Sequence, residues 1–202
     1  MPTAERGRGA RLQQRLTELA AALAEPMTLA RAHDVPDFIF VYDPKDELIL
    51  RDCLPGFVQS LGQHRRRAEL ISLAEIMWAI LNGGGWTPRL EEAEPTTGLT
   101  AANDTVVQLL SSGTESLEDR VRACLEALDP DRDVAVLHRA GALFPAYRTS
   151  ALMARLEGLR VPVVLCFPGR SEPPSGLSFM GRTSPDSHYR ATILDDDGRP
   201  DA

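Results

Sequence analysis

The sequence predicts an α/β fold with a mostly parallel central sheet, helices on both faces and a C-terminal edge hairpin. Two observations lead to this prediction. Strand-like and helix-like segments alternate along the 202 residues, and such alternation is typical of parallel sheets with helical crossovers. The strand-like segments are also continuous apolar runs, as expected for strands that are covered on both faces.

The N-terminal half is predicted to contain two strands and three helices. Apolar residues recur every three or four positions from Leu12 to Leu23, which is the period of one helix face. Asp43-Pro44 is a good helix start, and Pro55 indicates that the helix it opens is kinked or split. The predicted elements are a helix over 12–23, a strand over 38–42, a helix over 43–61, a strand over 68–72 and a helix over 73–81.

The C-terminal half continues the alternation. Residues 83–103 are rich in Gly, Pro, Thr and Glu, and we expect them to form an exposed connection. The segments 176–180 and 188–194 are expected to pair as the edge hairpin. The other predicted elements are helices over 101–111, 116–128 and 149–159 and strands over 133–138 and 161–167. We expect one domain over 10–194, with disordered tails at 1–9 and 195–202.

The charge of the chain argues against direct binding of nucleic acid. The net charge is −7, whereas affinity for duplex DNA comes mainly from Lys and Arg that neutralise phosphates. Arg65, Arg66 and Arg67 form a basic run between a predicted helix and a predicted strand. A solvated turn is the favoured interpretation of this run, and a DNA contact is the alternative.

Cysteine usage and hydropathy indicate a cytoplasmic protein. Cys53, Cys124 and Cys166 are widely spaced and odd in number, which is typical of reduced thiols in a core and not of a disulfide framework. No stretch approaches the roughly 18 apolar residues of a membrane span, so we expect no membrane association.

The known catalytic and cofactor motifs are missing from the sequence. It contains neither G-x-x-x-x-G-K-[ST] nor G-x-G-x-x-G, the loops that bind nucleotide phosphates. Ser150 lacks the G-x-S-x-G turn of a nucleophile, and the four histidines have no spacing typical of metal ligands. We therefore predict a protein that is not an enzyme and that carries no cofactor or metal.

Ligands of open parallel sheets bind beyond the carboxyl ends of the strands, which directs attention to the loops 42–47, 139–145 and 168–170. Asp43, Asp46 and Glu47 could hold a divalent cation, but capping of the following helix is the favoured interpretation. Arginines at strand or helix ends could bind phosphate, a partner's carboxylates, or Asp43 and Glu47 within the fold. These arginines are Arg139, Arg148 and Arg190.

An ordered set of short motifs resembles the BrxB family. The motifs are Phe40-Val41-Tyr42-Asp43-Pro44 with Glu47 and Arg51, Ile71-Ser72-Leu73 with Trp78, residues 139–145 with Arg148 and Ser150, Pro162-Val163-Val164-Leu165 with Pro168-Gly169, and Tyr189-Arg190-Ala191. The resemblance implies a component of a BREX phage-exclusion system that associates with a PglZ-like partner and has no established catalytic motif.

On this basis we expect a non-catalytic scaffold or regulator in phage defence. The alternative is a degenerate nucleotide- or phosphate-binding domain, or a weak metal-dependent phosphoesterase, that uses Asp43, Glu47 and the three arginines. The candidate interaction or structural site comprises Tyr42, Glu47, Arg51, Arg139, Phe144, Arg148, Gly169, Tyr189 and Arg190.

Overall fold

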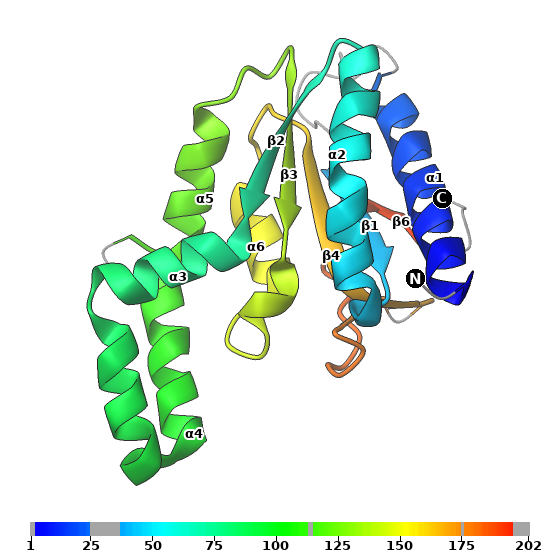
Figure 1. The fold of residues 1–202 in the computed structure, drawn as a ribbon. Helices are drawn as coiled ribbons and strands as arrows, with labels where there is room; N and C mark the ends of the chain where they lie inside the picture. Colours follow the sequence, from blue (N-terminus) through cyan, green and yellow to red (C-terminus); the bar gives the residue numbers. More distant parts are fainter. Residues whose placement is uncertain (1–2, 25–36, 113–114, 175, 196–202) are drawn as a thin grey trace.

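The computed structural model of the chain describes residues 3–24, 37–112, 115–174 and 176–195 (Figure 1). Within these residues, one sheet has the strand order β2-β3-β4-β1-β6, and β5 pairs with β4. The strands are β1 (Asp37–Tyr42), β2 (Arg67–Ser72), β3 (Asp133–His138), β4 (Val163–Glu172), β5 (Gly176–Phe179) and β6 (Ala191–Leu194). All neighbours in the β2-to-β6 order are parallel, and only β5 is antiparallel to its partner. The predicted fold class is confirmed.

Helices cover both faces of the sheet, as predicted (Figure 1). Successive side chains of a strand point to opposite faces, so Phe38 and Phe40 of β1 enter one core and Ile39 and Val41 enter the other. The first core is completed by α1 (Thr3–Ala24) and α2 (Glu47–Gln63). The second core is completed by α3 (Leu73–Gly83), α5 (Leu117–Glu126) and α6 (Thr149–Leu156).

Side-chain caps define several of the helix starts. Asp43 accepts a hydrogen bond from the backbone N–H of Lys45 and begins the 3-10 turn η1 (Pro44–Asp46) that leads into α2. Ser72 accepts from Glu75 N–H at the start of α3. Such caps satisfy donors that have no partner inside the helix. The predicted helix start at Asp43-Pro44 is confirmed, but α2 runs through Pro55 as one helix and is not split there.

Two segments predicted to lack structure are helical. Helix α1 begins at Thr3, so residues 3–9 are not a disordered tail. Most of the predicted connection 83–103 lies in α4 (Trp86–Ser112), which consists of two helices joined at Gly98, where φ is 84°. Figure 1 shows α4 as a helical hairpin that projects away from the sheet beyond α3. The expected tails at 1–2 and 196–202 lie outside the described residues.

The tail of the chain pairs differently from the prediction. The antiparallel hairpin joins the end of β4 to β5, with Gly169 opposite Phe179, whereas β6 pairs in parallel with β1 at the edge of the sheet. The segments 176–180 and 188–194 therefore do not form a hairpin with each other. Strand β4 accounts for this difference, because it continues past Pro168-Gly169 to Glu172 and offers its own extension to β5.

Two cysteines are buried, as expected for core thiols, namely Cys53 and Cys166, whereas Cys124 is exposed, and all three are free. A search of the described helices found none with the length and apolar character that a membrane crossing requires.

Candidate functional site

The carboxyl ends of four parallel strands meet at one edge of the sheet. Tyr42 of β1 lies opposite Pro168 of β4, and Ser72 of β2 lies opposite His138 of β3. The loops 42–47, 139–145 and 168–170 all leave from this edge, which is where open parallel sheets bind ligands.

A buried tyrosine and a glutamate form the first polar contact of this edge. Tyr42 is 3% exposed, and its hydroxyl donates a hydrogen bond to the carboxylate of Glu47, the first residue of α2. Burial raises the pKa of Tyr42, and the nearby charge of Glu47 raises it further. The phenol is therefore neutral and serves to hold Glu47 in place.

His138 lies at the end of β3 among four charged groups. Burial lowers the pKa of His138, and Arg139 lowers it further, while Glu47 and Glu75 raise it. Its Nδ1 is buried and has no hydrogen-bond partner among the described residues. Arg139, in the left-handed region with φ 59°, lies 3.4 Å from a carboxylate oxygen of Glu75 and 3.5 Å from Ser72 Oγ.

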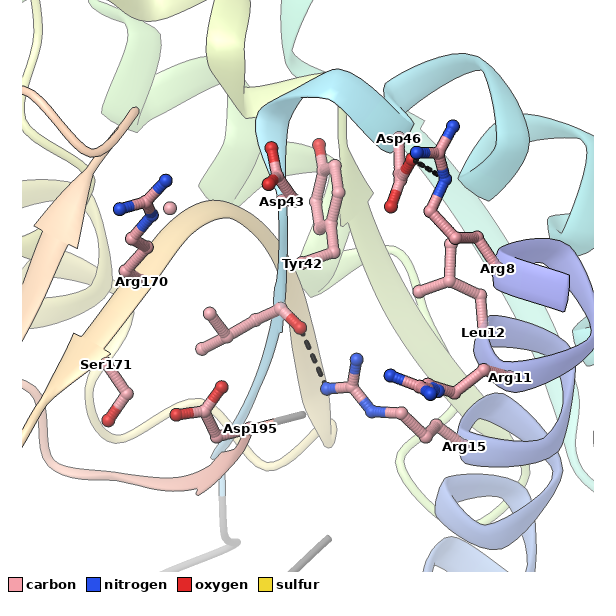
Figure 2. A pocket seen from close by; sticks show the side chains of 12 residues that line it. Arg8, Arg11, Leu12, Arg15, Tyr42, Asp43, Asp46, Arg170, Ser171 and Asp195 are labelled. Carbon is pink, nitrogen blue, oxygen red and sulfur yellow. Dashed lines mark hydrogen bonds and ion pairs between the residues drawn. The ribbon is translucent and has the colours of Figure 1, made fainter. Parts of the chain in front are cut away.

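A cavity of about 380 Å³ opens beside the ends of β1 and β4 (Figure 2). Guanidinium groups from α1 form one wall, and Arg170 of β4 lies on the opposite wall. The lining residues are Arg8, Arg11, Leu12, Arg15, Val41, Tyr42, Asp43, Asp46, Gly169, Arg170, Ser171 and Asp195.

Two of these arginines have well-defined contacts. Arg15 donates through Nη2 to the carbonyl oxygens of Val41 (2.8 Å) and Leu194 (2.9 Å), and its guanidinium lies 4.5 Å from the ring centroid of Phe40. Arg8 Nε lies 3.0 Å from a carboxylate oxygen of Asp46. Arg15 therefore links β1 to β6, and Arg8 links α1 to the turn before α2.

A second cavity, of about 250 Å³, lies where the tail contacts the start of α6. The hydroxyl of Tyr189 lies 2.8 Å from Thr149 Oγ1, and its ring meets that of Phe167 edge to face at 5.9 Å. Arg148, the residue before α6, supplies no side-chain cap and is exposed at this cavity. Tyr189 thus docks the tail on the first turn of α6.

Comparison with known families identifies the chain. A family model described as BREX protein BrxB matches residues 69–194, which is more than half of the sequence. The chain belongs to the BrxB family. Membership indicates a component of a BREX system, and hence a part in antiviral defence and phage resistance. No curated protein and no solved structure matched this chain.

The matched range of this BrxB-family chain begins in β2 and ends with β6, whereas α1, β1 and α2 precede it. The predicted site residues fall on both sides of that boundary. Tyr42, Glu47 and Arg51 come before the match, and the other six lie within it.

The structure distributes the predicted residues of the BrxB-family chain over separate places. The nearby charges of Arg139 and Arg51 lower the pKa of His138, and that of Glu47 raises it. Phe144 packs edge to face on Phe179 at 5.9 Å, and Phe179 lies opposite Gly169. Arg190 is 83% exposed and forms an ion pair with Glu157 at 3.6 Å.

The three predicted phosphate-binding arginines therefore do not share one partner. Among the described residues, Arg139 pairs with Glu75 and Arg190 with Glu157, and neither pairs with Asp43 or Glu47. In the same residues no group of three or more His, Cys, Asp or Glu side chains is arranged to hold a metal ion.

Sequence reasoning missed the arginine wall of the larger cavity. Arg8, Arg11 and Arg15 are spaced by three and four residues, which places them on one face of a helix. This spacing is readable from the sequence, but residues 1–9 were expected to be a tail. Arg170 was noted only as part of a loop, and no sequence signal connects it to α1.

Proposed function

We propose that this BrxB-family chain is a non-catalytic scaffold or regulator in the cytoplasm, and that it binds a PglZ-like protein through α4. The projecting hairpin of α4 is the observation that supports this proposal most directly (Figure 1). Of the residues of α4 whose burial is described, Leu110 is the one fully buried hydrophobic side chain.

The energetics of α4 favour a role outside the core of the domain. Ordering the backbone costs about 1–2 kcal/mol per residue, whereas full burial of one leucine returns only about 1.5–3 kcal/mol. Gly98 divides α4 into two helices, and isolated helices shorter than about 12–15 residues are marginal in water. Leu90, Val106 and Leu109 add partial burial against the core, but this is still little for a 27-residue element, and a partner that covers α4 would supply further apolar burial.

The exposed side chains of α4 and the neighbouring α3 indicate what kind of partner surface would fit them. Leu99, beside the turn at Gly98, is 71% exposed, and Trp78 of α3 is 47% exposed. Tryptophan is enriched among the few residues that dominate binding energy at protein interfaces, and Leu99 adds exposed apolar surface beside it. The charged residues of α4 are Arg89, Glu91, Glu92, Glu94 and Asp104. A matching partner would present an apolar pocket with a basic rim.

The polar groups of the carboxyl edge support a non-catalytic role. Tyr42 and Glu47 are joined to each other, and Arg139 contacts Ser72 and Glu75. The Nδ1 atom of His138 is buried, which keeps it from direct contact with a substrate that arrives from solvent.

The contacts of the basic run disfavour direct DNA binding. Arg67 forms a bidentate contact with the fully buried Asp133, at 2.9 and 2.6 Å. Arg66 donates to the carbonyl oxygen of Asp131 at 2.9 Å. Two of the three arginines are therefore used to join β2 to β3 and the loop before it.

The test is co-purification of the tagged full chain with the products of its neighbouring genes. We expect a stoichiometric PglZ-like protein with the wild type and about fivefold or greater weakening of binding for Trp78→Ala and Leu99→Ala, because interface anchors contribute more than about 1 kcal/mol each. Leu48→Ala is the matched control, since Leu48 is 68% exposed on α2. Recovery of no partner, or equal loss with Leu48→Ala, would refute the proposal. Arg148→Ala and Arg190→Ala, in the same assay, test the two predicted site arginines at the start of α6 and in the tail.

A further inference from the structure

The larger cavity lies where two adjacent parallel strands separate. After Tyr42 the chain turns into η1 and α2, whereas β4 continues past Pro168 and pairs with β5. The hollow between these paths is closed on one side by α1 (Figure 2). Open α/β sheets bind ligands in such crevices beyond the carboxyl ends of their strands.

The walls of this cavity carry the opposite sign of charge to the chain as a whole. Four arginines face three aspartates, so the lining has a net charge of +1, whereas the whole chain has a net charge of −7. The charged lining residues are Arg8, Arg11, Arg15, Arg170, Asp43, Asp46 and Asp195. The cavity therefore favours an anionic ligand, in contrast to the net negative charge of the chain as a whole.

Two of the guanidinium groups are placed to bind a ligand from opposite sides. Arg8 uses Nε for its contact with Asp46, and its terminal nitrogens Nη1 and Nη2 are not part of that contact. Arg170 is exposed on the opposite wall and, among the described residues, forms no ion pair. A guanidinium presents five donors in a planar fork that matches a phosphate group.

The other lining residues indicate what the phosphate is attached to. Ser171 offers a hydroxyl near Arg170, and Asp43 and Asp195 offer carboxylates that accept hydrogen bonds from hydroxyl or amino groups. The volume of about 380 Å³ lies at the small end of the roughly 300–1,000 Å³ typical of small-molecule sites. The three carboxylates would repel a chain of phosphates, so a single phosphate group fits best.

We infer that this cavity binds a small phosphate monoester of the size of a nucleoside monophosphate, with Arg8 on one side of the ligand and Arg170 on the other. This site is distinct from the α4 surface, and it does not depend on partner binding. It shares Asp43 with the phosphate site expected from the sequence, but its arginines are different ones.

Isothermal titration of the full chain at low ionic strength tests the inference. The ligands are AMP, ribose 5-phosphate, adenosine, inorganic phosphate and sulfate. We expect AMP and ribose 5-phosphate to bind, adenosine to give no heat, and the two inorganic anions to bind more weakly than either ester. Arg170→Ala and Arg8→Ala should each weaken AMP by about 10-fold or more, because each removes a charge-assisted hydrogen bond.

Arg160→Ala is the matched control, since Arg160 is exposed and lies outside this cavity, and it should bind AMP like the wild type. If Arg170→Ala does not fold, Arg170→Lys keeps the charge and removes the fork, and it should weaken AMP by a smaller factor. Absence of binding by AMP and ribose 5-phosphate would overturn the inference. The same follows if sulfate or phosphate binds as tightly as AMP, which would indicate an adventitious ion only, or if the variants bind AMP like the wild type.

Discussion

The carboxyl group of Asp37, at the start of β1, is expected to make the free energy of unfolding depend on pH near neutrality. Burial raises the pKa of this carboxyl to about 7 from an ordinary value of 3.8, and Glu157 also raises it, while the backbone N–H of Val163 lowers it. Between these two values the folded protein holds a proton that the unfolded chain has released.

The sign and size of the effect follow from this difference in proton binding. The stabilising contribution is fully present below about pH 4 and is lost as the pH rises to about 7, because the folded state binds more protons in this window. A shift of about three pKa units corresponds to at most about 4 kcal/mol. Because Asp37 is only partly buried, screening by solvent reduces the expected loss to about 2 kcal/mol.

Urea unfolding of the wild type and of Asp37→Asn between about pH 5 and pH 8 measures this contribution. Over this range, which covers somewhat more than half of the titration, we expect the stability of Asp37→Asn relative to the wild type to rise with pH by about 1 kcal/mol. His138, with its lowered pKa, acts in the opposite direction, but it is common to both proteins and cancels in the difference. Asp52→Asn, at an exposed position on α2, is the control. A difference between Asp37→Asn and wild type that is constant with pH would refute the reasoning.

Three further substitutions test other parts of the structure by chemical denaturation. Leu110→Ala should destabilise the fold by about 3 kcal/mol because Leu110 is fully buried. The exposed Leu99, changed to Ala, should alter stability by less than about 0.5 kcal/mol. Equal effects would contradict the assignment of Leu110 as the anchor of α4. Gly169→Ala should cost about 1–3 kcal/mol, since an added Cβ would collide with the backbone of β5, and an unchanged midpoint would argue against the tight β4–β5 contact. Tyr42→Phe should cost about 1 kcal/mol through loss of its hydrogen bond to Glu47; a neutral result would show that water replaces that bond.

The central strands were predictable because burial on both faces leaves a direct mark on the sequence. The runs 38–42 and 133–138 are nearly uniformly apolar, and both are strands of the described sheet. Strand pairing leaves no such mark. Residues 191–194 pair with β1, which is about 150 residues earlier in the chain, and nothing in their local pattern distinguishes this partner from β5.

The second half of α4 contains the helix predicted over 101–111, but its first half was missed for a related physical reason. Hydrophobic periodicity reports burial, and the helix before Gly98 buries little, so it carries no clear apolar stripe. Gly98 and Pro95 also interrupt the pattern. The arginine wall was missed because the apolar period begins only at Leu12, so the helix was not extended back to Arg8.

The position of β1 has a consequence for how the chain folds during synthesis. Both neighbours of β1 in the sheet come from the last third of the chain, since β4 begins at Val163 and β6 at Ala191. Until these residues have left the ribosome, the apolar strand β1 has two unpaired edges, and such edges readily join other chains. Pairing at so large a sequence separation is also slow. Chains interrupted before about residue 160 are therefore expected to aggregate. Chains that include β4 but end before β6 should retain one open edge of β1, beside Arg15.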